Sequence, residues 1–293
     1  MEIISVTEQM IWDRLKPRQP DSNKGTYGKL LILAGSAHYR GAASLAALGA
    51  LRCGTGIVTI ASTERVIASA AAKLYECTYL PLPETPDGSA QFAWEQKDWQ
   101  NALERATVCL AGCGMTSCPD TEKWVDSLLR HASCRLILDA DALNALQKAP
   151  SSLTVAKKTP IITPHVGEMA RLTGYSIPEI KQSPAKIARE TAEKLHAVTV
   201  LKDSVTHIAI PSGPLYRNTT GNAGLAKGGS GDVLAGIISA LAAQGLSAED
   251  AAVCGVWLHG KAADRLSEKK GQYAMLPSEL PDALCDVFAE NRR

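Results

Sequence analysis

A glycine-rich segment at residues 221–232 runs directly into a stretch of small and aliphatic residues at 233–243. Glycines let the backbone turn several N–H groups toward one point, and a helix over the second stretch would add unpaired N–H groups and the positive end of its macrodipole. We expect an anion-binding hole formed by Gly228, Gly229, Ser230 and Gly231. Asp232 follows in the first helical turn, where a carboxylate can take a proton from a hydroxyl that attacks a phosphoryl group.

The same spacing also fits a simpler structure, in which the glycines form a tight turn and Asp232 only favours the helix macrodipole. Glycine spacing alone does not separate the two interpretations. Two better known motifs are excluded. A P-loop needs a lysine after its glycines, whereas Lys227 precedes the glycine pair. A nucleophile elbow, Gly-x-Ser-x-Gly, needs a glycine where Asp232 stands, so neither a P-loop NTPase nor a serine hydrolase is supported.

The composition is that of a globular protein without a strong overall charge. The 293 residues are 45% hydrophobic, and 31 basic against 30 acidic side chains give a net charge of +1. No overall field would draw this chain to nucleic acid or to an anionic membrane. The N-terminus has no basic segment leading into an apolar one, and the apolar runs are too short to span a bilayer. We therefore expect a cytoplasmic protein with neither nucleic-acid nor membrane partners.

Eight cysteines are present, without a Cys-x2-Cys pair and without a histidine at the spacing of a zinc site. Several stand inside apolar patterns, such as Cys109 and Cys254, which favours reduced core thiols over a metal or redox role. Cys113, between Gly112 and Gly114, is the cysteine that we expect near a ligand.

From residue 29 onward, short aliphatic runs alternate with longer amphipathic stretches, which predicts βαβ units around a parallel sheet. The predicted strands are 29–36, 56–62, 107–113, 134–141, 160–163 and 198–203, followed by an antiparallel edge of 206–211 and 214–217. The predicted helices are 41–53, 64–74, 233–243, 247–269 and 277–291. Segments 17–24 and 81–89 are proline-marked and expected to be surface loops. No linker divides the chain, so we expect one domain over residues 1–293, with a helix and loop in residues 1–23.

Ligands of open parallel sheets bind beyond the carboxyl ends of the strands. The residues expected there include Gly35, Ser36, Gly112, Cys113, Gly114, Asp139, Asp141, Thr163, His165, Lys202 and Asp203. Glu168 opens the helix that follows, where its carboxylate could hold Mg²⁺ directly or through water, or only favour the helix N-terminus. His165 could contact a ligand or cap the same turn.

Asp139 and Asp141 stand two apart at a strand end, so they should point to opposite sides and not form an acid/base dyad. One could face a ligand while the other caps a helix through Asn144, and the cap is favoured for Asp141. Lys202 precedes a polar turn suited to the ribose or phosphates of a nucleotide; the alternative is a solvated surface lysine.

Four segments together resemble the ATP- or ADP-dependent NAD(P)H-hydrate dehydratases of the ribokinase-like superfamily. They are KGTYGKLLILAGS at residues 24–36, RGAA at 40–43, TPHVGE at 163–168 and GNAGLAKGGSGDVLAG at 221–236. The combination is far more specific than any single motif, and the resemblance runs from about residue 24 to the end of the chain. It implies a ribokinase-like α/β fold, with a central, mostly parallel sheet flanked by helices on both faces.

The resemblance also implies a reaction, the repair of hydrated NADH and NADPH. The terminal phosphate of a nucleotide would pass to the ring hydroxyl of the hydrate, and elimination of phosphate would restore the dihydronicotinamide. ADP is the expected co-substrate, with ATP as the alternative, and Mg²⁺ the expected cofactor. The substrates would be (S)-NADHX and (S)-NADPHX, with AMP and phosphate as by-products. A homo-oligomer, such as a tetramer, is the expected assembly.

Carried over position by position, the resemblance assigns roles to single residues. The hydrated cofactor would contact Ala42, Gly114, His165 and Asp232. The adenine nucleotide would contact Lys202, Asp203, Ser204, Val205, Thr206, Gly228, Gly229, Ser230 and Gly231. Asp232 would be the catalytic base, and Glu168 would hold the Mg²⁺.

The chain also departs from its relatives. The first matched segment begins at residue 24, so we expect the epimerase domain of the bifunctional form to be lacking and the S epimer alone to be used. Lys227 stands where some relatives carry a smaller residue, which leaves its role open between phosphate contact and surface charge. Two other functions remain: a ribokinase-like kinase of a vitamin precursor, which would release a stable phosphorylated product, and a nucleotide sensor, which would need no positioned base.

Overall fold

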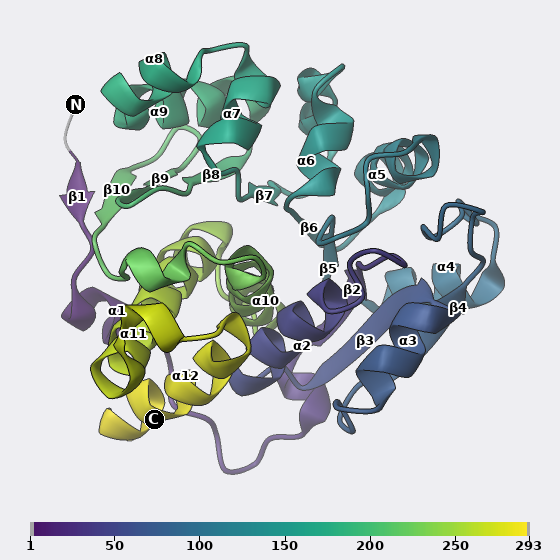
Figure 1. The fold of residues 1–293 in the computed structure, drawn as a ribbon, viewed down its shortest axis with the longest axis horizontal. Coiled ribbons are helices and arrows are strands. Elements are labelled where there is room, and N and C mark those ends of the chain that lie inside the picture. The colour runs from purple at the N-terminus through teal and green to yellow at the C-terminus, as the bar shows by residue number, and fades with distance from the viewer. Residues whose placement is uncertain (1–2, 292–293) are drawn as a thin grey trace.

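The computed structural model describes residues 3–291, and a ten-stranded sheet forms its centre (Figure 1). The strands lie in the order β1-β10-β9-β8-β7-β6-β5-β2-β3-β4. Their bounds are β1 Ile4–Ser5, β2 Lys29–Leu33, β3 Ile57–Thr63, β4 Thr78–Leu82, β5 Val108–Ala111, β6 Arg135–Leu138, β7 Ile161–Ile162, β8 Val198–Leu201, β9 Thr206–Ala209 and β10 Leu215–Asn218. Only β9 runs antiparallel to its neighbours, which confirms the predicted mostly parallel sheet.

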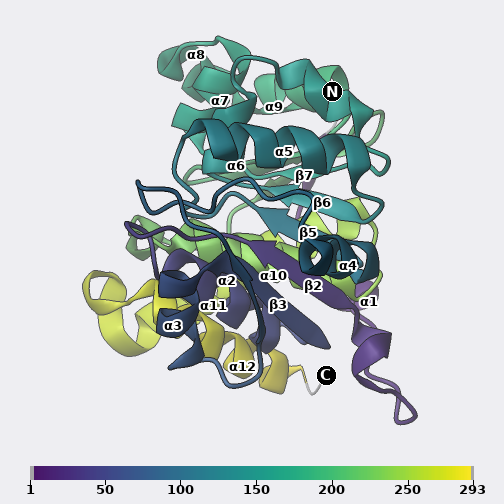
Figure 2. The same cartoon turned by 90° about the vertical axis from the view of Figure 1, so that its right-hand side faces the viewer.

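Helices cover both faces of the sheet, as Figure 2 shows from the side. On one face lie α1 Glu8–Arg14, α2 Ala42–Arg52, α3 Glu64–Ala71, α10 Ser230–Ala243, α11 Ala248–Ala274 and α12 Leu280–Glu290. On the other lie α4 Lys97–Arg105, α5 Pro119–His131, α6 Asp141–Leu146, α7 Val166–Thr173, α8 Ile177–Gln182 and α9 Pro184–Leu195. Within residues 3–291, no helix is long and apolar enough to cross a membrane.

The strands are apolar at nearly every position because both faces of the sheet are covered. In β2, Leu30 and Ile32 belong to the core under α2 and α10, whereas Leu31 and Leu33 belong to the core under α4 and α5. Successive side chains of a strand point to opposite faces, so one aliphatic run serves two cores. The sequence pattern therefore identified these strands well.

Two strands, β1 and β4, were not predicted from the sequence. β4 includes Pro81, which we had placed in a surface loop over 81–89; the prediction was wrong there because an edge strand tolerates proline. β1 is only two residues long and pairs parallel with β10, so β10 is not the edge of the sheet. The last predicted helix, 277–291, is divided into a 3-10 turn, Pro277–Glu279, and α12.

Two small-residue helices, α2 and α10, pack backbone against backbone. A Cβ added at Gly236 of α10 would overlap the carbonyl oxygen of Ala46 and lie 2.8 Å from its carbon. A Cβ at Gly49 of α2 would lie 2.7 Å from the carbonyl oxygen of Val233. This packing holds the beginnings of the two helices, Ala42 and Ser230, near the same edge of the sheet.

We expect Gly236→Ala to destabilise the protein by about 1–3 kcal/mol, because the added methyl group must push α10 away from α2. Thermal or denaturant unfolding measures the loss. Gly41→Ala is the matched control, since Gly41 has a helical backbone (φ −79°) and no atom within 4 Å of the added carbon. Equal stability of the two variants would show that the helices have room to separate.

Candidate functional site

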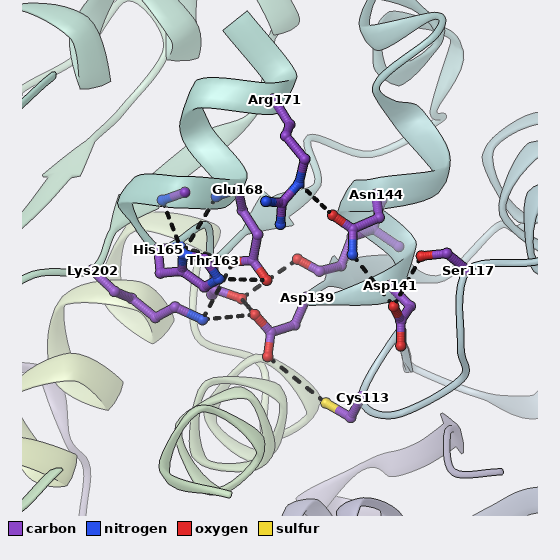
Figure 3. A network of polar contacts seen from close by, with 12 residues as sticks. Cys113, Ser117, Asp139, Asp141, Asn144, Thr163, His165, Glu168, Arg171 and Lys202 are labelled. Carbon is purple, nitrogen blue, oxygen red and sulfur yellow. Dashed lines mark hydrogen bonds and ion pairs between the residues drawn. The ribbon is translucent and has the colours of Figure 1, made fainter. Parts of the chain in front are cut away.

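A cluster of polar side chains lies where β5, β6, β7 and β8 end, as Figure 3 shows. Asp139, which follows β6, is its centre. Its Oδ1 accepts hydrogen bonds from Lys202 Nζ at 2.8 Å and from Thr163 Oγ1 at 2.7 Å. Its Oδ2 lies 3.9 Å from the thiol of Cys113. Four strand ends are thus joined through one buried carboxylate.

Asp232 faces this cluster from the first turn of α10. The ligand atoms of Cys113, Asp139 and Asp232 all lie within 4.8 Å of one another. Burial raises the pKa of Asp232 to about 7, and the charge of Asp139 adds to the rise; the Cys113 thiol and Lys202 act in the opposite direction. A carboxyl group with a pKa near neutrality can both take up and release a proton under physiological conditions.

Lys202 is not a solvated surface lysine, so that alternative was wrong. Its side chain is 20% exposed and pairs with Asp139. Its Nζ also lies 4.0 Å from Glu168 Oε2. Burial by itself would lower the pKa of Lys202, but the two carboxylates outweigh burial and the net shift is upward, so the ammonium stays charged.

The glycine segment brings its backbone close to this lysine. A Cβ added at Gly231 would lie 3.5 Å from Lys202 Nζ and 3.7 Å from Asp139 Oδ2. Gly229 has a φ of 103°, a left-handed conformation that favours glycine. The hydroxyl of Ser230 is buried and has no hydrogen-bond partner within the described part of the chain. The glycine loop thus lies beside a fixed positive charge, and its role as an anion hole stays a prediction.

His165 and Glu168 form a capping box at the start of α7. His165 Nδ1 accepts from the backbone N–H groups of Gly167 and Glu168, at 2.9 and 3.3 Å. Glu168 Oε2 accepts from the backbone N–H of His165 at 2.8 Å. The capping interpretation of His165 is confirmed; contact with a ligand stays a prediction. Burial raises the pKa of the Glu168 carboxyl, against the influence of Lys202, and lowers the pKa of His165.

The helix cap that the sequence favoured for Asp141 was wrong: Asp141 is the first residue of α6, the N-cap is Ala140, and no side chain among the described residues caps this helix. Asp141 does meet Asn144, whose Nδ2 donates to it at 3.3 Å. It also accepts from the backbone N–H of Thr116 at 2.8 Å and from the hydroxyl of Ser117 at 3.2 Å. These bonds anchor the loop after β5, which carries Gly114, and turn Asp141 away from Asp139 (Figure 3).

The predicted contacts of the hydrated cofactor come together at the same edge of the sheet. Gly114 has a φ of 63°, and a Cβ there would lie 2.9 Å from the Cβ of Ala42 and 2.6 Å from that of Tyr39. Ala42 begins α2, whose packing against α10 places it on the side of Asp232. The loop after β5 therefore packs directly against the start of α2.

The turn between β8 and β9 holds the remaining predicted nucleotide contacts. Asp203 Oδ1 accepts from the backbone N–H of Ser204 at 2.8 Å, which fixes the turn locally. Asp203 and Ser204 are exposed, and Val205 and Thr206 are half-buried. Beyond Lys202, no described contact joins this turn to the cluster around Asp139, so these contacts stay predictions.

Sequence reasoning missed one residue beside the site, His259. Thr163 and Asp139 were recognised at strand ends, but nothing in the sequence showed that Thr163 and Lys202 both donate to Asp139. His259 of α11 gave no signal because it stands inside a helical pattern; burial lowers its pKa to about 4, so it is neutral, and the charge of Lys202 contributes. Its Nε2 has no hydrogen-bond partner within residues 3–291.

Asp232→Asn should stabilise the protein more at pH 8 than at pH 5. The pKa of this carboxyl is about 7 in the folded protein against 3.8 ordinarily, so the folded state binds the proton more tightly. The protonated Asp232 therefore contributes its full stabilisation below about pH 4. The free energy of unfolding falls by up to ~4 kcal/mol as the pH rises through about 7 and Asp232 ionises. Asparagine does not ionise, so the variant should not lose this stability.

The free energy of unfolding in denaturant, measured at both pH values, tests this expectation. Asp21→Asn, at an exposed position, is the control for the loss of one charge. A difference between Asp232→Asn and wild type that does not change with pH would mean that Asp232 titrates normally in the folded protein.

Comparison with known proteins gives a consistent result. A sequence model of the NAD(P)H-hydrate dehydratase family matches residues 30–285. The ADP-dependent (S)-NAD(P)H-hydrate dehydratase of Bacillus subtilis is 36% identical over 282 residues, which cover 96% of each chain. The bifunctional NAD(P)H-hydrate repair enzyme of Moorella thermoacetica is 41% identical over 274 residues, 92% of this chain but 51% of that protein. The chain thus spans about half the length of such bifunctional relatives.

Solved structures agree with the sequence comparison. The ADP/ATP-dependent NAD(P)H-hydrate dehydratase of Bacillus subtilis, co-crystallized with ATP/Mg²⁺, has a TM-score of 0.83 at 35% identity, with 99% of each chain covered. A ribokinase-like superfamily protein of Enterococcus faecalis, 24% identical, has a TM-score of 0.83 and shows the fold alone. The fold is therefore ribokinase-like, as expected. From the match over residues 30–285 and the 36% identity along nearly the whole chain, this protein belongs to the NAD(P)H-hydrate dehydratase family.

Proposed function

We propose that this chain is an ADP-dependent (S)-NAD(P)H-hydrate dehydratase that repairs hydrated NADH and NADPH. The observation that carries the proposal is Asp232, a half-buried carboxyl with a pKa of about 7 at the start of α10, beside the glycine loop. A general base needs a pKa near the working pH and a position next to the developing charge. Family membership supplies the substrate class, and Asp232 supplies the chemistry.

In the proposed reaction, Asp232 takes the proton of the ring hydroxyl as the hydroxyl oxygen attacks the terminal phosphoryl group of ADP. AMP leaves, and the phosphate is joined to the ring. The backbone N–H groups of Gly228, Gly229 and Gly231 would hold the phosphoryl oxygens with the hydroxyl of Ser230, aided by the macrodipole of α10. Departure of phosphate from the ring carbon, with loss of a proton from the adjacent carbon, then restores the double bond. Phosphoryl transfer of this kind depends on positioning and charge stabilisation.

Lys202 would contribute a fixed positive charge close to the glycine loop. Its ammonium stays protonated between Asp139 and Glu168 and lies near Gly231. Together with Asp203, Ser204, Val205 and Thr206, it would bind the nucleotide. Asp139 holds the Lys202 ammonium in place, so the lysine would not have to move when phosphate oxygens bind beside it.

Magnesium fits the carboxylates of this edge of the sheet. Glu168 Oε2 already accepts from His165 N, and Lys202 Nζ lies beside it, so Glu168 would hold the ion through water rather than directly. Magnesium near phosphates usually keeps several waters, which suits such a contact. When bound, the ion would neutralise the charge that develops on the phosphoryl oxygens.

The hydrated nicotinamide would bind between the starts of α2 and α7. Ala42 and Gly114 pack against each other there, and neither has a large side chain that would cover the ring. His165 is half-exposed; its Nδ1 is occupied by the capping bonds and its Nε2 lies 3.4 Å from Glu168 Oε1, so a ligand would meet Nε2 beside that carboxylate. These contacts would orient the ring hydroxyl toward Asp232.

Domain organisation, compartment and assembly belong to the proposed function as well. We take residues 1–293 as one domain, because β1 near the N-terminus pairs with β10 in the same sheet and the C-terminal helices α10–α12 share one core with it. The enzyme would act in the cytoplasm, where reduced nicotinamides are used and thiols such as Cys113 stay reduced. It would assemble as a homo-oligomer, with a tetramer as the form to test by light scattering.

Purified protein should restore the absorbance of the reduced nicotinamide when it is given (S)-NADPHX, Mg²⁺ and ADP. Asp232→Asn should lower kcat by about 10²–10⁴-fold, because the base is lost while the anion hole remains. Nucleotide binding by the variant, measured by calorimetry, should be retained and serves as the control. Formation of a stable phosphorylated product without recovery of absorbance would instead indicate a small-molecule kinase.

The pH profile of kcat/KM should fall on its acid side with a midpoint of about 7, where Asp232 becomes protonated. Lys202 lowers the pKa of Asp232 and Asp139 raises it. The midpoint should therefore move to higher pH in Lys202→Met and to lower pH in Asp139→Asn. Circular dichroism would confirm that both variants fold. A midpoint that shifts in the same direction in both would contradict the assignment of this limb to Asp232.

A further inference from the structure

Lys227 neither points into solvent nor stands free for a phosphate. Its Nζ donates to the backbone carbonyl of Tyr273 at 2.8 Å and to that of Met275 at 2.7 Å. These acceptors lie 46 and 48 residues further along the chain. The side chain that precedes the glycine loop is therefore fixed to the far end of α11.

The end of α11 is a place where such a donor is needed. The helix is interrupted at Gly271, with a φ of 71°, and ends at Ala274. The last carbonyls of a helix have no partner within it, and a cation near them is favourable. The last turn of α11 has no basic residue of its own. Lys227 supplies the missing cation from another segment.

Two further contacts join the same two segments. Met275 is buried, and its side chain fills the space next to Gly224, where an added Cβ would lie 2.8 Å from Met275 Cγ. Pro277 lies against Gly229, with 3.4 Å between its Cβ and an added glycine Cβ. Residues 224, 227 and 229 of the glycine loop thus each contact the stretch 273–277.

The segment 273–277 has little else to hold it on its outer side. The Tyr273 side chain is 99% exposed and Leu276 is half-exposed. On the inner side, Glu279 accepts from the backbone N–H of Leu276 at 2.9 Å and pairs with Lys270. The contact with Lys227 is therefore the point at which this segment and the glycine loop fix each other.

We propose that Lys227 is a positioning residue: by binding the carbonyls of Tyr273 and Met275, it holds the glycine loop in the conformation that receives the nucleotide phosphates. Lys227 N donates to Leu225 O at 2.8 Å, and Lys227 O accepts from Ser230 N at 3.3 Å, so its backbone belongs to the loop itself. Fixing its side chain therefore fixes the start of α10. An anion hole stabilises charge best when its donors need no reorganisation.

The first part of the test uses the protein without ligands. Amide hydrogen exchange at residues 228–231 and 273–277 should be faster by about 10-fold in Lys227→Met, since two hydrogen bonds from a charged donor are lost. Lys227→Arg, which keeps a charged donor, should restore most of the protection. Lys181→Met, at an exposed position of α8, is the matched control and should exchange like wild type.

The second part uses the reaction and rests on the proposed function. The KM for ADP should rise by about 10-fold in Lys227→Met, while the KM for (S)-NADPHX should change by less than about 2-fold. Met275→Ala should raise the KM for ADP as well. In the double variant the KM for ADP should rise by clearly less than the product of the two single fold-changes, because both substitutions disturb the same contact. A merely structural loss would change both KM values together.

Unchanged hydrogen exchange of the ligand-free Lys227→Met protein would overturn the proposal, and so would effects of the two variants that multiply fully. Either result would mean that the contact of Lys227 with residues 273 and 275 does not fix the glycine loop. The exchange experiment needs no substrate. A failure of the dehydratase assay would therefore leave the exchange result intact, and the two proposals can fail separately.

Discussion

The ion pair between Asp139 and Lys202 is the interaction on which the candidate site depends. It joins the ends of β6 and β8, which are separated in the sheet by β7, and Thr163 at the end of β7 donates to the same carboxylate. Leaving one partner of a buried pair alone costs several kcal/mol, so neither residue can change independently. The pair also sets the charge that Asp232 experiences, because its two members shift the pKa of Asp232 in opposite directions.

A second constraint is the close backbone contact between α2 and α10. Backbone contact at Gly236 and Gly49 fixes the helices at a short distance, and their starting residues carry the proposed substrate and phosphate contacts. Close-packed helices cannot shift separately. The small residues of the pattern 42–50 therefore let α2 pack closely against α10. This packing also determines the distance between Ala42 and Asp232.

The sequence predicted the sheet and the edge at which the site lies, because strand ends in parallel sheets converge wherever the aliphatic runs end. It did not predict which groups pair. Asp139 and Lys202 are 63 residues apart, and their contact depends on the register of three strands. Lys227 shows the same limit: its acceptors are backbone carbonyls at a helix break, which no residue pattern marks. The two-residue β1 and the proline-containing β4 were missed because short or edge strands carry little pattern.

The carboxylates of Asp139 and Asp232 lie within reach of each other, and the groups around them differ. Asp139 accepts from a lysine and a threonine, and a thiol lies near its other oxygen. Asp232 is half-buried beside it; burial and then the charge of Asp139 raise the pKa of Asp232, while the thiol of Cys113 and Lys202 act against the rise. Burial and the neighbouring carboxylates raise the pKa of Cys113 far above its ordinary value, so it stays a thiol that donates between the two. Asp139 is already engaged by these donors, whereas Asp232 lies at the start of α10 with a raised pKa, which is why Asp232 is the proposed proton acceptor.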